Sequence, residues 1–460
     1  THDNVLSTPG FIDSALQATA GYLVDNTLSE SGVYLPFSID LIQFGSANLG
    51  SASQVVVDKL KKTKDASAQK FDIDLFDSNK RSLIRINGFL VRAIKERKSE
   101  TVQVQNNNSQ RIAVVSVSCK FPDADSPEIF WDNLLLSKES ITEIPSQRWD
   151  YRKSYDPIRK GIRNKNYSKW GGFIDDVELF DAEFFKIKEM DALAMDPQHR
   201  ILMELTQHLF DRAGYLPKEV SGKNIAVIIG GASCEYNQLS QNFLPDEAHK
   251  NMVVNTIQNM MSARISDFYN LSGTALTLDT ACSSSLVAVH EGVQKLLRFE
   301  SDMVIAGGIR LLLSDLAFNG FSQAQVLSDD GKCYVFDQRA KGLVLGEGAG
   351  LVLLKRYEDA VKDGDQIMAT IIGSATNNDG KTMGITTPNL NKQIDVIKAT
   401  LNKADIPKES IGYLEAHGTG TLLGDPIEVK AATQVYGGEG VEKQHCAIGS
   451  VKSNIGHLLH

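Results

Sequence analysis

The sequence predicts an α/β fold for most of the chain, preceded by a small α+β segment. From Ile112 onward, continuous apolar runs that fit buried strands alternate with helical patterns, as in a sheet covered on both faces. Before that point a helical pattern is followed by strand-like runs, and the polar stretch 96–110 separates the two parts. We therefore predict a small unit at 1–95, a linker at 96–110 and a large unit at 111–460.

The small unit combines one predicted helix with three predicted strands. Phe11–Leu23 has apolar residues at helical spacing. Strand-like runs follow at Gly32–Ile39, Phe71–Leu75 and Ser82–Arg92. This order favours a helix laid on a sheet.

The large unit alternates strands and helices. The helix predicted at Pro197–Ala213 has Asp196 as its cap and a proline in its first turn, and an apolar helix is predicted at Ser283–Leu297. Strands are predicted at Ile112–Val117, Asn224–Ile229, Thr274–Leu278, Met303–Ile309, Gly348–Lys355 and Met368–Ala375.

Composition excludes several classes of function. A net charge of −9 argues against a nucleic-acid binder, because phosphates would be repelled. The 5 cysteines show no C-x-x-C spacing, so no zinc or redox site is expected. No apolar run approaches the roughly 18 residues of a membrane span, and no signal peptide opens the chain, so we expect a cytoplasmic protein.

Cys282 lies where a predicted strand turns sharply into a helix. Free backbone N–H groups and the positive end of the helix dipole favour a thiolate there, and they can stabilise an oxyanion. Cys282 is therefore a candidate nucleophile. A buried structural cysteine is the alternative that the position alone leaves open.

Two histidines occupy matching positions near the C-terminus. His417 is predicted to lie at the end of a strand and to precede glycines, and His457 repeats this arrangement. Side chains at the carboxyl ends of strands face the active sites of α/β proteins, so both could converge on one thioester. Two neutral imidazoles could stabilise an enolate there. A structural histidine is the alternative for each.

Three segments together resemble one family. In order and spacing they resemble the signatures of ketosynthase domains of modular polyketide synthases. The segments are Asp279–Ser285, then Glu415–Thr421 with Gly424–Pro426, and then Gly449–His457. The segment from Arg148 to Gly172 is more similar to synthases whose acyltransferase acts in trans.

The resemblance implies a thiolase-like, layered αβαβα fold, a homodimer and a two-step reaction. Cys282 would accept an acyl chain from the phosphopantetheine of an acyl carrier protein. His417 and His457 would then assist decarboxylation of a malonyl-type extender, giving a β-ketoacyl thioester. Lys452 matches a lysine that orients the second histidine, and Asp425 matches an acidic residue that closes the first histidine loop; a structural ion pair is the alternative for both.

The resemblance also implies partners but no bound cofactor and no metal. The expected partners are acyl carrier proteins and other synthase domains. Because the family continues past the position of His460, we expect the layered fold to be incomplete at its C-terminal end. The alternatives are a non-elongating ketosynthase that only transfers acyl chains, which commonly lacks one histidine, and an inert docking or scaffold fragment.

The small unit resembles another synthase domain. It is similar to the C-terminal half of a polyketide dehydratase, and this similarity implies an α+β segment that is half of a hot-dog fold. The similar segments are Pro9–Gln17, Leu35–Ile39 and Arg85–Arg92. Asp13 and Gln17 share one helix face and match the family's acid and its hydrogen-bonding companion. The half that would carry the catalytic histidine is not in this segment, so dehydration by this piece alone is not expected.

Overall fold

In the computed structural model the chain divides into two compact units, Thr1–Gln105 and Asn106–His460. The division falls within the predicted linker. The structure describes residues 33–38, 41–44, 52–59, 68–77, 79–94, 111–158, 160–233, 235–438, 441 and 444–460. The helix predicted at Phe11–Leu23, with Asp13 and Gln17, and the linker lie outside these residues. No helix among the described residues is both long and apolar enough to cross a membrane.

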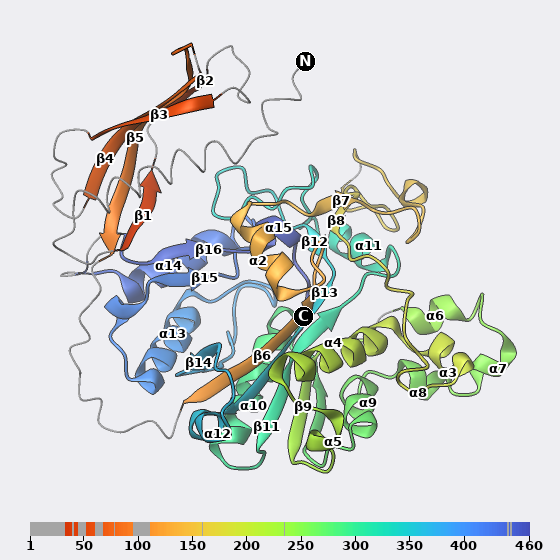
Figure 1. The fold of residues 1–460 in the computed structure, drawn as a ribbon. Coiled ribbons are helices and arrows are strands. Elements are labelled where there is room, and N and C mark those ends of the chain that lie inside the picture. The colour runs from red at the N-terminus through yellow and green to blue at the C-terminus, as the bar shows by residue number, and fades with distance from the viewer. Residues whose placement is uncertain are drawn as a thin grey trace. The chain divides into compact units, whose positions relative to one another are not determined.

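The described part of the first unit is an antiparallel sheet with strand order β1-β5-β4-β3, and β2 also pairs with β5 (Figure 1). The strands are β1 (Val33–Ser38), β2 (Leu41–Phe44), β3 (Ala52–Lys59), β4 (Ala68–Asp77) and β5 (Ser82–Ile94). In β4, Phe71, Ile73 and Leu75 are buried and the residues between them are not, as expected for side chains that alternate between two faces. The sequence patterns predict β1, β4 and β5 but not β2 or β3.

The second unit is built on a six-stranded mixed sheet with strand order β10-β9-β11-β13-β6-β14 (Figure 1). The strands are β6 (Ile112–Lys120), β9 (Ile225–Gly230), β10 (Ala275–Leu278), β11 (Met303–Arg310), β13 (Gly348–Arg356) and β14 (Ala369–Ile371). β9 runs parallel to β10 and β11, whereas β13 runs antiparallel to β11 and β6. All six predicted strands are confirmed.

Helices cover both faces of this sheet. α4 (Pro197–Ala213) and α9 (Met260–Phe268) pack on one face, and α10 (Ser284–Leu297) packs on the other. In β9, Val227 belongs to the core under α4, whereas Ile228 belongs to the core under α10. A strand buried on both sides must be apolar throughout, which explains why the sequence reveals it so clearly.

The predicted boundaries of α4 agree with the structure at both ends. The Asp196 side chain accepts a hydrogen bond from the N–H of Gln198 at 2.8 Å, so it caps the first turn. Gly214 ends the helix with φ of 77°, a left-handed conformation that favours glycine.

Two smaller sheets complete the second unit. β15 (Tyr413–Glu415) and β16 (Ala447–Gly449) pair in parallel, and β12 (Leu345–Gly346), β8 (Trp170–Gly172) and β7 (Ile141–Glu143) form the other sheet. The remaining elements are α2 (Pro127–Leu135), η3 (Tyr151–Lys153), α3 (Glu189–Ala194), α5 (Pro217–Val220), α6 (Tyr236–Ser240), α7 (Asp246–His249), α8 (Met252–Thr256), η4 (Ala281–Ser283), α11 (Leu316–Gln323), α12 (Tyr357–Asp363), α13 (Leu390–Ala404), η5 (Lys408–Ser410), α14 (Gly424–Tyr436) and α15 (Lys452–Ile455).

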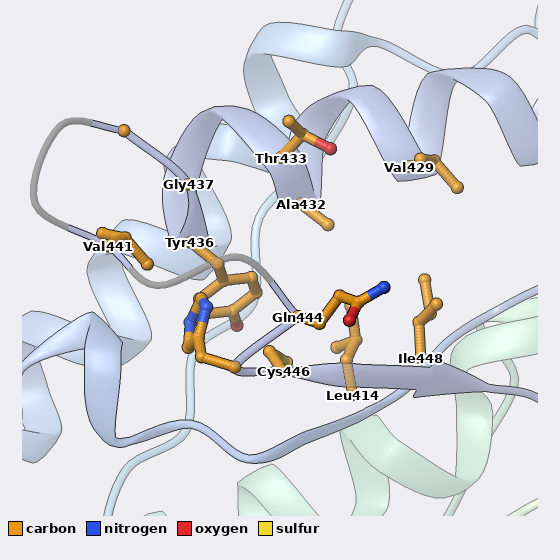
Figure 2. A pocket seen from close by; sticks show the side chains of 12 residues that line it. Leu414, Val429, Ala432, Thr433, Tyr436, Gly437, Val441, Gln444, Cys446 and Ile448 are labelled. Atoms are coloured by element: carbon orange, nitrogen blue, oxygen red, sulfur yellow. The ribbon is translucent and has the colours of Figure 1, made fainter. Parts of the chain in front are cut away.

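An apolar pocket of about 420 Å³ lies between α14 and the β15–β16 sheet (Figure 2). Leu414 and Ile448 contribute to it from the two strands, and Val429 and Tyr436 contribute from the helix. None of the candidate catalytic side chains lines this pocket.

Candidate active site

The turn that holds Cys282 has a constrained backbone. Cys282 lies in η4 (Ala281–Ser283), between β10 and α10, which is the predicted elbow between strand and helix. Ala281 has φ of 54°, and its N–H donates to Asp279 Oδ1 at 2.8 Å. The start of α10 lies so close to the sheet that a Cβ on Gly230 would be 2.5 Å from its backbone. The elbow therefore fixes the position from which the thiol reacts.

Burial raises the pKa of the Cys282 thiol, although part of the side chain is exposed. The surrounding protein disfavours the thiolate more than a backbone hydrogen bond and the charge of Lys452 favour it. The contribution predicted for the helix start is present as this backbone hydrogen bond, but burial outweighs it in the net direction of the pKa shift.

His417 follows β15 closely, as predicted. Its loop is held by Glu428 of α14, whose two carboxylate oxygens accept hydrogen bonds from the N–H groups of His417 at 2.6 Å and Gly418 at 2.8 Å. Gly418 has φ of 44°, which favours glycine. The sequence analysis missed Glu428. The sequence pattern that could have revealed Glu428 is an acidic residue near the start of the helix that follows the glycine-rich loop.

The side chain of Asp425 is hydrogen-bonded to the backbone of the loop that carries His417. Its carboxylate is buried and accepts hydrogen bonds from the N–H groups of Thr419 at 3.1 Å and Thr421 at 3.4 Å. A third hydrogen bond, at 2.8 Å, comes from the N–H of Phe336 in another segment. Asp425 thus holds this loop through backbone N–H groups, and among the described residues its carboxylate is in no ion pair. The role that the resemblance implies for it stays a prediction.

His457 is placed differently from the prediction. It does not follow β16 directly, because α15 intervenes, and it pairs instead with the edge of β12. The N–H of His457 donates to the Val344 carbonyl at 2.7 Å, and the Gly346 N–H donates to the His457 carbonyl at 2.9 Å. The periodicity of the sequence cannot reveal a bridge between such distant segments.

A backbone hydrogen bond selects the tautomer of His457. The N–H of Leu459 donates to His457 Nδ1 at 3.0 Å, so this nitrogen carries a lone pair and the proton of the neutral ring is on Nε2. Leu459 is itself buried in a cluster with Phe173 and Leu345. His457 therefore offers an N–H donor at Nε2.

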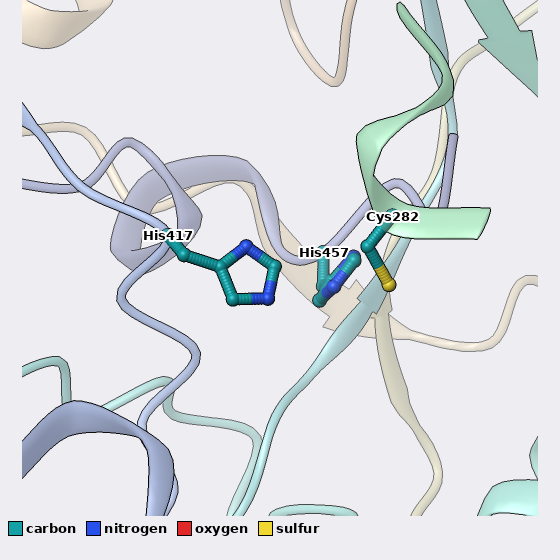
Figure 3. A group of neighbouring side chains, drawn as sticks. All are labelled: Cys282, His417 and His457. Carbon is teal, nitrogen blue, oxygen red and sulfur yellow. The ribbon is translucent and has the colours of Figure 1, made fainter. Parts of the chain in front are cut away.

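The structure brings Cys282, His417 and His457 together from three different parts of the fold. One donor atom from each lies within 4.8 Å of the other two. The imidazole centroids are 5.5 Å apart with the rings at 88°, and the side chain of His457 is drawn between those of His417 and Cys282 (Figure 3). A small electrophile can contact all three groups.

Both imidazoles are neutral at pH 7. Desolvation by the surrounding protein lowers the pKa of the buried His457 to about 3, and it lowers the pKa of His417 to about 4 although part of that residue is exposed. The charge of Lys452 contributes in the same direction to both. Neutral rings can donate N–H hydrogen bonds to a developing negative charge without first losing a proton.

Lys452 lies in α15 and acts on the site through its charge. Burial lowers the pKa of its ammonium group, and the carboxylates of Glu415 and Glu428 oppose this effect. Among the described residues its Nζ forms no hydrogen bond or ion pair, so the structure shows no direct orientation of His457 by Lys452.

The donor atoms of these same three side chains are also close enough together to hold a metal ion, and no other such group occurs among the described residues. The tautomer of His457 does not fit that use. A metal would need the Nε2 lone pair, which would place a proton on Nδ1 against the N–H of Leu459. The arrangement suits donation to an oxyanion better than ligation.

The family of the second unit follows from its sequence match. Residues 109–360 match the family described as "Beta-ketoacyl synthase, N-terminal domain", and residues 368–460 match "Beta-ketoacyl synthase, C-terminal domain". The chain belongs to the β-ketoacyl synthase family. The predicted ketosynthase and its thiolase-like fold are thereby confirmed, and ketosynthases are enzymes that form carbon–carbon bonds.

The similar proteins are polyketide synthases. One of the phenolphthiocerol/phthiocerol polyketide synthase proteins of Mycobacterium tuberculosis is 44% identical over 353 residues, which are 76% of this chain and 22% of that protein. Polyketide synthase PksL of Bacillus subtilis is 43% identical over 366 residues, which are 79% of this chain and 8% of that protein. This ketosynthase chain thus matches only a small part of each relative.

Solved ketosynthase structures share the fold. The ketosynthase from module 6 of the bacillaene synthase of Bacillus subtilis superposes with a TM-score of 0.70 at 42% identity, over 76% of this chain and 58% of that one. An oxazolomycin ketosynthase domain of Streptomyces albus gives a TM-score of 0.70 at 35% identity, over 75% and 61%.

The first unit also has a family match. Residues 2–101 match "Polyketide synthase dehydratase N-terminal domain". This match confirms the predicted relationship to a dehydratase, but its description names the N-terminal domain, so the assignment to a C-terminal half stays a prediction. The roles of Asp13 and Gln17, which lie outside the described residues, also stay predictions.

Proposed function

We propose that the second unit accepts an acyl chain onto Cys282 and condenses it with a malonyl-type extender to give a β-ketoacyl thioester. The substrates are carried on the phosphopantetheine of acyl carrier proteins, and no cofactor is bound to the protein itself. The observation that carries this proposal is the convergence of one thiol and two neutral imidazoles within 4.8 Å.

In the first step the Cys282 sulfur attacks the acyl thioester. A new carbon–sulfur bond forms, the bond to the phosphopantetheine sulfur breaks, and the thiol proton of Cys282 ends on the departing phosphopantetheine. The N–H groups of Thr280 and Ala281 already donate to Ser284 Oγ and Asp279 Oδ1, so the backbone N–H of Cys282 itself is the elbow's candidate to stabilise the oxyanion.

In the second step the malonyl-type thioester loses CO2. The electron pair of the broken carbon–carbon bond moves into an enolate, whose oxygen accepts hydrogen bonds from His457 Nε2–H and from His417. The enolate carbon attacks the acyl carbonyl, and Cys282 leaves as a thiolate. The thiolate then takes one proton from water, and the raised pKa of Cys282 favours this return to the thiol.

The proposal can be tested by mass spectrometry on the full chain with acyl-loaded and malonyl-loaded carrier proteins. A condensing enzyme gives both acyl-Cys282 and an elongated product on the carrier. Acyl-Cys282 without elongation would indicate a transfer-only ketosynthase, and no acyl-Cys282 would indicate a scaffold.

We expect His417→Ala to separate the two steps. Loss of one donor to the enolate oxygen should slow elongation by about 100- to 1000-fold, whereas loading of Cys282 should change by only a few fold. Both rates can be followed by mass spectrometry of single turnovers. His290→Ala is the matched control, since His290 lies in α10 and its ring is hydrogen-bonded to Ser374 Oγ at 2.8 Å, outside the catalytic group. Unimpaired elongation by the His417 variant would contradict its proposed role.

We expect elongation to persist well below pH 6.5. Because the pKa values of His417 and His457 are lowered to about 4 and about 3, both rings stay neutral until the pH falls towards 4. The unfolded chain binds these protons near pH 6.5, so stability also falls as the pH drops below that value. The single-turnover rate of the loaded enzyme should therefore be measured against pH together with circular dichroism. A half-maximal rate at pH 6.5 in the folded protein would rule out neutral, low-pKa imidazoles.

We further infer a homodimer within a larger synthase. β10 is the end strand of the six-stranded sheet, and Ala275 and Leu276 are exposed there. An unpaired edge can add a strand from a second copy. Carrier protein domains and other synthase domains are the proposed remaining partners, and the cytoplasmic location stays a prediction.

A further inference from the structure

His457 and β12 form one continuous backbone ladder. Val344 and Gly346 provide the carbonyl and the N–H that bond to the backbone of His457, and Leu345 lies directly beside it. The direction of the His457 ring therefore depends on where the short β12 strand lies. A strand of 2 residues has few hydrogen bonds of its own to hold that position.

A buried ion pair fixes the residue that follows β12. The Glu347 side chain is fully buried, and its two oxygens accept hydrogen bonds from Arg148 Nη1 at 2.8 Å and Nη2 at 2.9 Å. The N–H groups of Leu312 at 2.7 Å and Ile174 at 3.2 Å donate to the same oxygens. Burial raises the pKa of the Glu347 carboxyl, whereas the Arg148 guanidinium and the two backbone N–H groups lower it. None of these four donor groups can accept a hydrogen bond from a protonated carboxyl, so the arrangement fits the carboxylate. The planar guanidinium holds it in one orientation.

Glycines let the backbone before His457 lie directly on β8 and β12. A Cβ on Gly172 would be 2.2 Å from the Ile455 carbonyl oxygen, and a Cβ on Gly346 would be 2.5 Å from it. The N–H of Glu347 donates to the Gly172 carbonyl at 2.8 Å, which joins the two strands at this point. A shift of Glu347 would thus move β8 and β12, against which the backbone at Ile455 and His457 packs.

We propose that Arg148 and Glu347 are positioning residues for the condensation step, which act by holding β12 and through it the direction of His457 Nε2–H. This inference rests on the proposed function of His457 as a donor to the enolate. Misplacement of a catalytic group by about 1 Å can cost about 100-fold in rate, so the effect should appear in elongation and not in loading of Cys282.

A second buried cation in the same unit provides a matched control. Lys355 Nζ lies 2.7 Å from Asp365 Oδ2 and 3.0 Å from the Tyr215 hydroxyl, and Lys355 is 4% exposed. Lys355 is on β13, and among its described partners none belongs to β12 or to the His457 segment. A change there should disturb the fold without moving His457.

The test compares Arg148→Lys and Glu347→Gln with Lys355→Met and His457→Ala in the full chain. Arg148→Lys keeps the charge but loses the two-point contact, and Glu347→Gln keeps the shape but loses the charge. We expect both to lower the ratio of elongation to loading by about 10- to 100-fold at temperatures where each is folded. Lys355→Met should lower the melting temperature and leave that ratio unchanged.

A spectroscopic readout separates positioning from general destabilisation. In protein labelled with ¹⁵N-histidine, His457 should show one tautomer, with its proton on Nε2, and the signal is assigned by its loss in His457→Ala. Arg148→Lys and Glu347→Gln should give a mixture of tautomers, whereas Lys355→Met should not. An unchanged tautomer and an unchanged ratio in both variants would overturn the positioning role. Unimpaired elongation by His457→Ala would instead overturn the proposed function itself.

Discussion

Replacing Cys282 with alanine should abolish loading of the acyl chain and slow elongation by at least about 1000-fold. The acyl intermediate needs a sulfur nucleophile, and Cys282 is the only sulfur in the group that it forms with His417 and His457. The loss should be visible as missing acyl mass on the peptide that contains residue 282. The fold should not change, because the Cys282 side chain is partly exposed.

Cys446→Ser is the matched control for this experiment. Cys446 is another partly exposed thiol, on the segment that leads into β16, and it is not near the two histidines. This variant should load and elongate like the wild type. Acylation that persists in Cys282→Ala and disappears in Cys446→Ser would reverse the assignment of the nucleophile.

Gly307→Ala should destabilise the second unit by about 3 kcal/mol. Gly307 lies in β11 at the centre of the six-stranded sheet, and a Cβ there would be 2.0 Å from the Gly350 carbonyl oxygen of β13. Neither strand can move away, since both are hydrogen-bonded on their other sides. The change can be measured by urea unfolding followed by tryptophan fluorescence. The 3 tryptophans of the chain, Trp131, Trp149 and Trp170, all lie in the second unit.

Gly320→Ala tests the same chemical change where space is available. Gly320 lies in α11, and a Cβ there would have no neighbour within 4 Å. Because alanine favours the helix and restricts the unfolded chain, we expect a stabilisation of about 0.5–1 kcal/mol. Equal effects of the two substitutions would show that packing at Gly307 does not limit stability.

The main sheet could be predicted because its strands are buried on both faces. The six residues of β9 are all buried, so their apolar character stands out in the sequence. The capped helix α4 and the elbow at Cys282 are also local patterns, which a sequence displays directly. By contrast, β2 is a strand of only 4 residues, and β3 carries three successive valines instead of an alternating pattern.

The catalytic geometry could be predicted only in part. Resemblance placed Cys282, His417 and His457 in one site, but the bridge from His457 to β12 joins residues more than 100 positions apart and leaves no periodic trace. The net direction of the Cys282 pKa also escaped prediction, since helix-start N–H groups are visible in the sequence whereas the desolvating neighbours come from the tertiary fold. Glu428 was missed for the same reason, as its partners are backbone atoms of another segment.

The three reactive side chains come from three separate sheets. Cys282 follows the six-stranded sheet, His417 follows the β15–β16 pair, and His457 is bonded to the sheet that contains β12. Each sheet can form its own hydrogen bonds whether or not the other two sheets are correctly positioned against it. Catalytic competence in this ketosynthase is therefore a property of the quality of tertiary assembly, and a chain with complete secondary structure but loosely stacked sheets would be inert.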